Sequence, residues 1–258
     1  MEKQTVIVTG ASRGLGAAVA RIAGKMGANV VLVGRTVERM EEEARAIQAA
    51  RGSAFALSGD VSREADCQAV IERTLERLGA VDALVNNAGV VEPIAPLAEA
   101  DVKAWEQNWA VNVLGPLMLT RLALPSLRER GGRVINISSG AAENVVGGWG
   151  AYSTAKAALN HFTHILASEE PAITAIALLP GIVDTEMQAT IREKGKGRMA
   201  ERNYAYLSGM HEQGKLLSPD LPGLATACLA LYAPRDWSGQ VMRWDDERVQ
   251  ELVKTRGF

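Results

Sequence analysis

Residues 5–16, which read TVIVTGASRGLG, decide the fold of this chain. The apolar run TVIV leads directly into three glycines, Gly10, Gly14 and Gly16, and a helical pattern begins at Leu15. A strand, a glycine-rich turn and a helix in this order let the backbone approach a pyrophosphate closely, and the helix N-terminus offers it unpaired N–H groups. The stretch therefore predicts the first βα unit of a Rossmann-type fold that binds a dinucleotide.

Outward from this stretch, short runs rich in Val, Ile and Leu alternate with helical stretches to the end of the chain. Most runs lack polar alternation, which is typical of parallel strands buried on both faces. We predict an α/β fold: a single Rossmann-type doubly wound domain over residues 1–258, with a seven-stranded parallel sheet flanked by helices on both faces. The predicted strands are Thr5–Val8, Asn29–Val33, Ser53–Leu57, Val81–Val85, Arg133–Ile137, Ile173–Leu179 and Gln240–Trp244. The predicted helices are Leu15–Met26, Val37–Ala50, Arg63–Leu78, Glu99–Glu129, Tyr152–Glu169 and Pro219–Tyr232.

Composition and charge exclude several other classes of protein. Of the 258 residues, 47% are hydrophobic and 22% are charged, which is typical of a folded chain rather than a disordered one. Lys and Arg number 28 and Asp and Glu number 30, so the net charge of −2 predicts no nucleic-acid partner and no anionic-membrane surface. The longest charge-free stretches have 14 residues, short of the roughly 20 apolar residues that span a membrane, so we expect no membrane partner.

The cysteine count and the first residues indicate a cytoplasmic location. Only Cys67 and Cys228 occur, without metal-ligand spacing or a disulfide framework. The start MEKQTVIVTG enters the first predicted strand at once, so we expect no signal peptide. His161 and His164 are three apart but no third ligand accompanies them, so we predict no metal site.

Residues 186–217 interrupt the alternation of strands and helices. The segment contains Gly195, Gly197, Gly209 and Gly214, and we predict a long irregular insertion. Such insertions in a compact domain are often functional, so we interpret it as a substrate lid. The alternative is a plain surface excursion.

The residues after the second predicted strand favour NADP(H) over NAD(H). A site selective for NAD places Asp or Glu here to bind the ribose hydroxyl, whereas this chain has Gly34-Arg35-Thr36. Arg35 offers a planar guanidinium suited to a 2′-phosphate, and Arg13 in the glycine-rich turn adds a second one. The alternative is that both arginines are merely solvated.

Three further residues can carry the chemistry of a carbonyl reduction. Tyr152 and Lys156 are four apart and share one face of a predicted helix, and Ser139 ends the fifth predicted strand. Tyr152 can donate a proton, but its ordinary pKa is near 10. A cation at roughly 4 Å contributes about 4 kcal/mol at an effective dielectric near 20, enough to lower that pKa by up to roughly three units. We therefore predict that Tyr152 is the general acid, that Lys156 lowers its pKa, and that Ser139 donates a hydrogen bond to the carbonyl oxygen.

The spacing TGxxxGxG, the segment NNAG at 86–89, NISS before the sixth strand and the YxxxK pair resemble the short-chain dehydrogenase/reductase family. The resemblance extends from Thr5 to about Trp244 and implies an NADP-dependent oxidoreductase that acts on CH–OH and C=O groups. It implies a catalytic set of Asn112, Ser139, Tyr152 and Lys156, in which Asn112 positions Lys156 through a water. It also implies a homodimer or homotetramer, since the family pairs its two long helices.

The resemblance and the strand ends together predict the cofactor and substrate residues. The cofactor-binding residues are Gly10, Ser12, Arg13, Gly14, Leu15, Gly16, Arg35, Thr36, Asp60, Val61, Asn87, Ala88, Gly89, Tyr152, Lys156, Pro180, Gly181, Val183 and Thr185. The substrate residues are Ser139, Gly140, Glu143, Val145, Trp149, Tyr152 and Met187. Further candidate walls are Ala141, Val90–Pro93 and the lid residues Ile191, Met199, Tyr204, Leu207 and Met210, although apolar lid residues can equally be core.

Two longer phrases resemble a subgroup of the family. Residues 147–162 and the run PGIVDTEMQ from Pro180 are similar to benzil reductases and sepiapterin-reductase-like members. That resemblance implies an NADPH-dependent carbonyl reductase acting on a small-molecule vicinal dicarbonyl, a benzil-like α-diketone. The alternatives are a 3-oxoacyl carrier-protein reductase, a secondary-alcohol dehydrogenase, or a redox sensor that binds NADP(H) without turnover.

Overall fold

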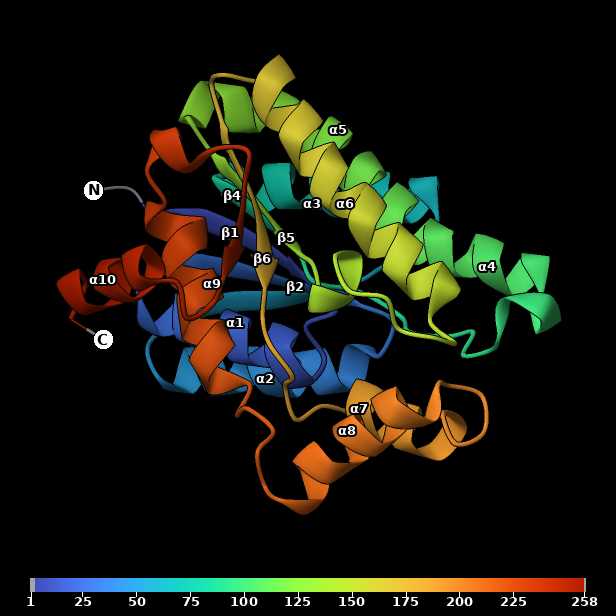
Figure 1. The fold of residues 1–258 in the computed structure, drawn as a ribbon. Helices are drawn as coiled ribbons and strands as arrows, with labels where there is room; N and C mark the ends of the chain where they lie inside the picture. The colour runs from blue at the N-terminus through green and yellow to red at the C-terminus, as the bar shows by residue number, and fades with distance from the viewer. Residues whose placement is uncertain (1–2, 258) are drawn as a thin grey trace.

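The computed structural model describes residues 3–257, and a sheet of seven parallel strands forms its centre (Figure 1). The strand order is β3-β2-β1-β4-β5-β6-β7, which confirms the predicted doubly wound α/β architecture. The strands are β1 (Thr5–Thr9), β2 (Asn29–Gly34), β3 (Ser53–Ser58), β4 (Ala83–Asn86), β5 (Arg133–Ile137), β6 (Thr174–Leu179) and β7 (Gln240–Arg243). After β3 the chain crosses back to β4, which pairs with β1, and in such folds a ligand crevice forms between those two neighbouring strands.

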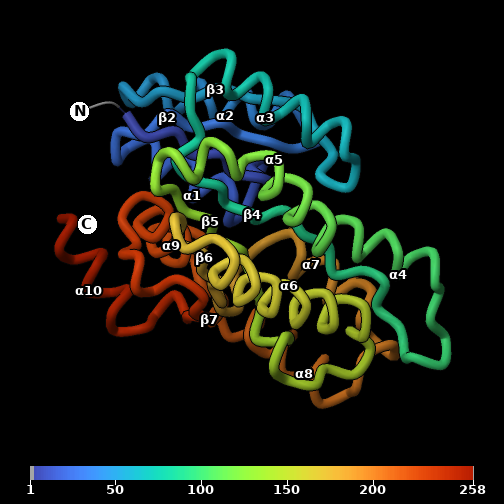
Figure 2. Tube along the Cα trace, turned by 90° about the horizontal axis from the view of Figure 1, so that it is seen from above, coloured from blue at the N-terminus to red at the C-terminus, as the bar shows by residue number. Residues whose placement is uncertain are grey.

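Two layers of helices cover the two faces of the sheet, as Figures 1 and 2 show. One face carries α1 (Gly14–Lys25), α2 (Val37–Ala49) and α9 (Asp220–Tyr232). The other carries α3 (Glu64–Leu78), α5 (Gly115–Arg130) and α6 (Gly150–Glu169). Side chains such as Val8 and Ile7 are fully buried on opposite faces of β1, which is why the strands read as continuous apolar runs.

The predicted helix Glu99–Glu129 is present as one helical stretch, Val102–Arg130, with a π-helical turn inside it. A short 3₁₀ turn η1 (Leu97–Glu99) precedes α4 (Val102–Trp109), and a π-helical turn η2 (Ala110–Leu114) separates α4 from α5. Taken together, Val102–Arg130 is the one helical stretch among residues 3–257 that is long and apolar enough to span a membrane by length and composition. A core helix passes the same test, and α5 packs against α3 while α4 packs against α6.

The insertion at 186–217 is helical rather than irregular, so that part of the prediction is wrong. It contains α7 (Glu186–Lys194) and α8 (Glu201–Glu212), which lie together at one side of the sheet (Figure 1). Gly195 and Gly197 make the turn between the two helices, and Gly214 follows the second. The side chains of Ile191, Met199 and Leu207 are buried against Trp149 and Tyr152, so apolar packing holds the insertion against the domain.

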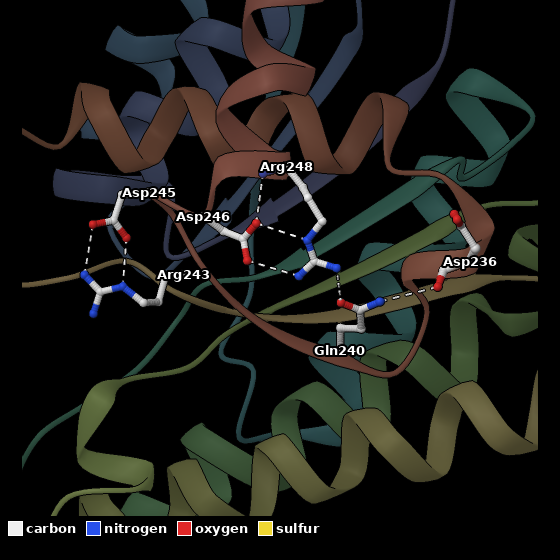
Figure 3. Close-up of polar contacts among 6 residues, drawn as sticks. All are labelled: Asp236, Gln240, Arg243, Asp245, Asp246 and Arg248. Atoms are coloured by element: carbon white, nitrogen blue, oxygen red, sulfur yellow. Dashed lines mark hydrogen bonds and ion pairs between the residues drawn. The ribbon is translucent and has the colours of Figure 1, made fainter.

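Ion pairs stabilise the turn after β7, at the edge of the sheet (Figure 3). Arg243 Nε lies 2.8 Å from Asp245 Oδ1, and Arg248 Nη2 lies 3.0 Å from Asp246 Oδ2. Asp246 also accepts a hydrogen bond from the Arg248 backbone N–H at 2.9 Å and so caps α10 (Glu247–Thr255). The sequence pattern did not lead us to predict α10. These exposed pairs order the chain locally and contribute little to global stability.

Candidate active site

A cavity of about 880 Å³ lies at the carboxyl ends of the strands. Its walls contain every predicted cofactor-binding residue, from the glycine-rich turn after β1 to the Pro180–Thr185 segment after β6. These residues are far apart in the sequence and meet because the parallel strands β1, β2, β4, β5 and β6 all end at this edge. The cavity is the candidate active site.

The glycine-rich turn is clamped against the end of β4. The Thr9 hydroxyl accepts hydrogen bonds from the backbone N–H groups of Asn87 and Ala88, each at 3.0 Å. The Asn87 side-chain amide in turn donates to the Thr9 carbonyl at 2.7 Å. A Cβ built on Gly16 would lie 2.3 Å from the Gly10 carbonyl oxygen, so only glycine fits at this position. The turn is therefore held in place by its own backbone and by the NNAG segment.

The geometry of this turn suits a pyrophosphate. Helix α1 begins at Gly14, and its N-cap residue Arg13 makes no side-chain capping hydrogen bond. Gly14, Leu15 and Gly16 line the cavity, so the N-terminal end of the helix, which favours an anion, borders it. A Cβ built on Gly14 would lie 3.1 Å from the Thr185 methyl group, which brings the segment after β6 against the glycine-rich turn. The glycine-rich turn, the start of α1 and Thr185 would hold the phosphates of a dinucleotide.

The end of β2 supplies positive charge to the same cavity. Arg35 and Thr36 line it, and the Arg35 charge acts on Asp60. Burial raises the pKa of Asp60, but hydrogen bonds from Ser62 and the charges of Arg35 and Arg63 outweigh it, so the pKa lies below the ordinary value. Asp60 accepts from the Ser62 N–H at 3.0 Å and from its hydroxyl at 2.7 Å, so its carboxylate shapes the turn before α3 as well as lining the cavity.

Tyr152, Lys156 and Ser139 meet in the wall of the cavity. Tyr152 and Lys156 lie on the first two turns of α6 and are buried, and Ser139 follows β5. The Ser139 hydroxyl oxygen accepts from the Ala141 N–H at 3.2 Å, and Ser139 acts on Tyr152 in the direction that lowers the pKa of the phenol. Lys156 Nζ donates to the Ile137 carbonyl at 2.7 Å and lies 5.7 Å from the centre of the Tyr152 ring. The structure therefore brings together three of the four predicted catalytic side chains.

The electrostatics of this group differ from our prediction. Burial raises the pKa of Tyr152, and the hydrogen bond from Ser139 opposes the rise without cancelling it. Burial also lowers the pKa of Lys156 from 10.5 to about 8. Burial and Ser139, and not Lys156, set the direction in which the pKa of Tyr152 moves in this structure. The prediction that Lys156 lowers the pKa of Tyr152 is therefore wrong for this structure, in which that pKa lies above its ordinary value.

Asn112, the fourth predicted catalytic residue, lies behind the cavity wall in the π-helical turn η2. Its side chain accepts from the Val90 N–H at 3.2 Å and donates to the Val90 carbonyl at 2.8 Å and to Asn108 Oδ1 at 2.9 Å. Asn108, which is fully buried, also donates to the carbonyls of Val90 and Glu92. A Cβ built on Gly89 would lie 2.9 Å from Asn112 Oδ1 and 3.6 Å from Lys156 Nζ, so both side chains reach the space beside Gly89.

The wall on the side of the lid is largely apolar. The ring of Trp149 stands edge-on to that of Tyr152, with the ring centres 5.6 Å apart. The lining also includes the predicted Gly140, Ala141, Val90–Glu92, Trp149, Met187, Ile191 and Leu207. Lining residues that the sequence reasoning missed include Asn144, Val146, Ile182, Gln188, Asn203 and Tyr206.

Several predicted substrate residues do not line the cavity. Glu143 and Val145 are exposed, Val145 to 95%, because the 3₁₀ turn η3 (Gly140–Ala142) directs the following residues outward. Val146 contributes to the wall in their place. Pro93, Met199, Tyr204 and Met210 are also outside the lining. Met199 packs in the apolar cluster that contains Trp149 and Tyr152, so this side chain belongs to the core rather than to the cavity wall.

The chain is similar to known dehydrogenases and reductases. Residues 4–196 match the family model of short chain dehydrogenases. A benzil reductase ((S)-benzoin forming) of Bacillus cereus is 34% identical over 252 residues, which cover 93% of this chain and 99% of that protein.

Two solved structures resemble the whole chain. A short chain dehydrogenase/reductase from Saccharomyces cerevisiae is 33% identical with a TM-score of 0.91, covering 96% of this chain and 99% of that one. An actinorhodin polyketide ketoreductase, determined with NADPH, is 26% identical with a TM-score of 0.82, covering 93% and 95%.

Proposed function

This chain belongs to the short-chain dehydrogenase family of oxidoreductases, and we propose that it is an NADPH-dependent carbonyl reductase whose substrate is a vicinal dicarbonyl. One observation carries the proposal: Ser139, Tyr152 and Lys156 lie in the wall of the cavity that also contains the glycine-rich turn. A proton donor and a dinucleotide site in one cavity are what the reduction of a carbonyl requires.

The chain's own residues would protonate and orient the substrate. When bound, NADPH supplies the hydride for the carbonyl carbon. The Tyr152 phenol is protonated at neutral pH and can donate its proton to the carbonyl oxygen, although burial raises its pKa and makes it a weaker acid until a cation lies beside it. Ser139 donates a second hydrogen bond to that oxygen as negative charge develops. Lys156, anchored on the Ile137 carbonyl, would hold the nicotinamide ribose, and Asn112 with Asn108 would fix the wall behind it.

The proposed preference for NADPH rests on the residues at the end of β2. Arg35 and Thr36 stand where a carboxylate would repel a 2′-phosphate, and both line the cavity. The related ketoreductase that was determined with NADPH supports the same cofactor. We expect Arg35→Gln to raise the KM for NADPH about tenfold while leaving that for NADH nearly unchanged.

The proposed substrate class rests on the lid side of the cavity and on the similarity to a benzil reductase. Trp149, Met187 and Leu207 form an apolar wall beside the Tyr152 hydroxyl, which suits an aromatic or alkyl group next to the reacting carbonyl. The similarity to a polyketide ketoreductase favours a second candidate substrate class, a 3-oxoacyl group.

A panel of carbonyl compounds tests the proposal. NADPH consumption at 340 nm is followed with benzil, diacetyl, an acetoacetyl ester and a simple ketone, and then with NADH in place of NADPH. We expect the highest kcat/KM with NADPH and a dicarbonyl. The highest value with the acetoacetyl ester would favour the 3-oxoacyl reductase, and tight NADPH binding without any turnover would favour a redox sensor.

We also propose that the protein assembles as a homodimer or homotetramer through α4, α5 and α6. Trp109, Leu117 and Ile165 on these helices are 37%, 42% and 43% exposed, and a partner subunit seated on the helices would cover this apolar surface. Light scattering gives the mass of the assembly, and a monomer at micromolar concentration would refute this proposal.

A further inference from the structure

The carboxylate of Glu186 lies between two arginines at the rim of the cavity. Its Oε2 is 2.5 Å from Arg13 Nη1, and its Oε1 accepts a hydrogen bond from Arg39 Nη1 at 3.1 Å. Arg13 precedes α1 in the glycine-rich turn, Arg39 lies in the first turn of α2, and Glu186 is the first residue of α7. One carboxylate therefore ties the lid to both elements that border the end of β2.

This bridge lies partly in the lining of the cavity that the proposed function assigns to an anionic cofactor, since Arg13 and Glu186 belong to that lining and Arg39 does not. Arg35, which the proposed function assigns to the 2′-phosphate, lines the same cavity. A guanidinium binds a carboxylate and a phosphate oxygen with the same planar donors, so the two anions compete for it. The side chains of Arg13, Arg39 and Glu186 are each about half exposed, and exposed ion pairs are weak enough to be exchanged.

We propose that Glu186 is a built-in substitute for the 2′-phosphate of NADP(H). In the ligand-free protein its carboxylate holds the guanidiniums of Arg13 and Arg39, and the 2′-phosphate displaces it when the cofactor binds. The inference rests on the proposed preference for NADP(H) and extends it, because it makes Glu186 a determinant of how tightly the 2′-phosphate is held. A nucleotide without that phosphate leaves the bridge intact.

The exchange also affects the lid, because Glu186 begins α7. The other end of that helix is held by Lys194, whose Nζ lies 2.8 Å from Glu92 Oε1. Displacing Glu186 frees the first end of α7 and leaves the second one attached. A ligand that carries a 2′-phosphate therefore loosens the first turn of α7, where the chain enters the lid, whereas a ligand without that phosphate does not.

Direct binding measurements test the competition. The dissociation constants of 2′,5′-ADP and 5′-AMP are measured by isothermal titration calorimetry on the full chain, for the wild type, Glu186→Gln and the control Glu193→Gln, which removes the same charge from the same helix. We expect Glu186→Gln to bind 2′,5′-ADP about three- to tenfold more tightly, because two weak ion pairs no longer compete. Its affinity for 5′-AMP, and both affinities of Glu193→Gln, should stay within about twofold of the wild type.

Limited trypsin digestion gives an independent measurement of the lid, since Lys196 and Arg198 are exposed between α7 and α8. We expect 2′,5′-ADP to speed cleavage there in the wild type, 5′-AMP to have no effect, and Glu186→Gln to be cleaved faster without any ligand. If Glu186→Gln binds 2′,5′-ADP no more tightly than the wild type does, the inference about Glu186 is wrong. The proposed cofactor still stands in that case, provided that the wild type favours 2′,5′-ADP over 5′-AMP. If the wild type shows no such preference, the proposed cofactor is wrong and the inference fails with it.

Discussion

The burial of Lys156 leads to a quantitative prediction about pH and stability. The side chain is 3% exposed, and burial lowers its pKa from 10.5 to about 8. Unfolding restores the ordinary value, so between pH 8 and pH 10.5 the unfolded state binds more protons than the folded state. The free energy of unfolding therefore rises with pH across this interval, and the contribution is lost again as the pH falls through about 8.

The size of the effect follows from the two pKa values. A pKa difference of about 2.5 corresponds to about 3 kcal/mol for the whole interval, and the part between pH 8 and pH 9.5 to about 2 kcal/mol. Lys156→Met keeps a side chain of similar length and cannot titrate. The variant also loses the hydrogen bond to the Ile137 carbonyl, but that loss applies at both pH values and cancels when they are compared.

Urea unfolding of the cofactor-free protein, followed by tryptophan fluorescence at pH 7.0 and pH 9.5, measures this difference. We expect the free energy of unfolding of the wild type, measured relative to that of Lys156→Met, to be about 2 kcal/mol larger at pH 9.5 than at pH 7.0. The exposed Lys254→Met serves as the control and should show no such change. If wild type and Lys156→Met keep a constant difference within about 0.5 kcal/mol, the pKa of Lys156 is not depressed and the reasoning fails.

Three substitutions test the remaining parts of the site. Tyr152→Phe removes the proton donor, so kcat for dicarbonyl reduction should fall by about 10²- to 10⁴-fold while calorimetry shows NADPH binding within about twofold of the wild type; retained turnover would exclude Tyr152 as the acid. Gly16→Ala places a Cβ 2.3 Å from the Gly10 carbonyl oxygen and should abolish NADPH binding, with native-like binding as the refuting result. Asn108→Leu leaves the Val90 and Glu92 carbonyls without this donor, so urea unfolding should show a loss of about 2–5 kcal/mol, and a loss below about 0.5 kcal/mol would contradict the role of Asn108.

The strands and the glycine-rich turn could be predicted because their causes are local. Arg133–Ile137 has the predicted bounds in the structure, and the other strands differ from the prediction by one or two residues. Strands buried on both faces need a continuous apolar run, and a chain that turns tightly into a helix needs glycine, so both features are visible in a short window. The same holds for Tyr152 and Lys156, whose spacing on α6 requires no knowledge of other elements.

The π-helical turn inside the predicted helix Glu99–Glu129 could not be predicted, because its cause lies elsewhere in the chain. The π-helical turn η2 accompanies the hydrogen bonds that Asn108 and Asn112 make to Val90, a residue about twenty positions earlier in the chain. The helices of the lid were missed for a related reason. Four glycines lower the local helix propensity, and apolar contacts such as that of Ile191 with the core beneath the lid compensate for it.

The sequence by itself determined the doubly wound sheet, the place of the dinucleotide loop, and the residues able to donate or hold a proton. These depend on hydrophobic periodicity, glycine positions and short spacings. Only the tertiary structure decided how those residues behave. Burial of Tyr152 and Lys156 raises the pKa of the first and lowers that of the second, and the placement of Glu186 between Arg13 and Arg39 puts a carboxylate where a phosphate was expected. The physical reason is that desolvation and long-range charge pairing depend on what surrounds a side chain in space, which the order of residues along the chain does not reveal.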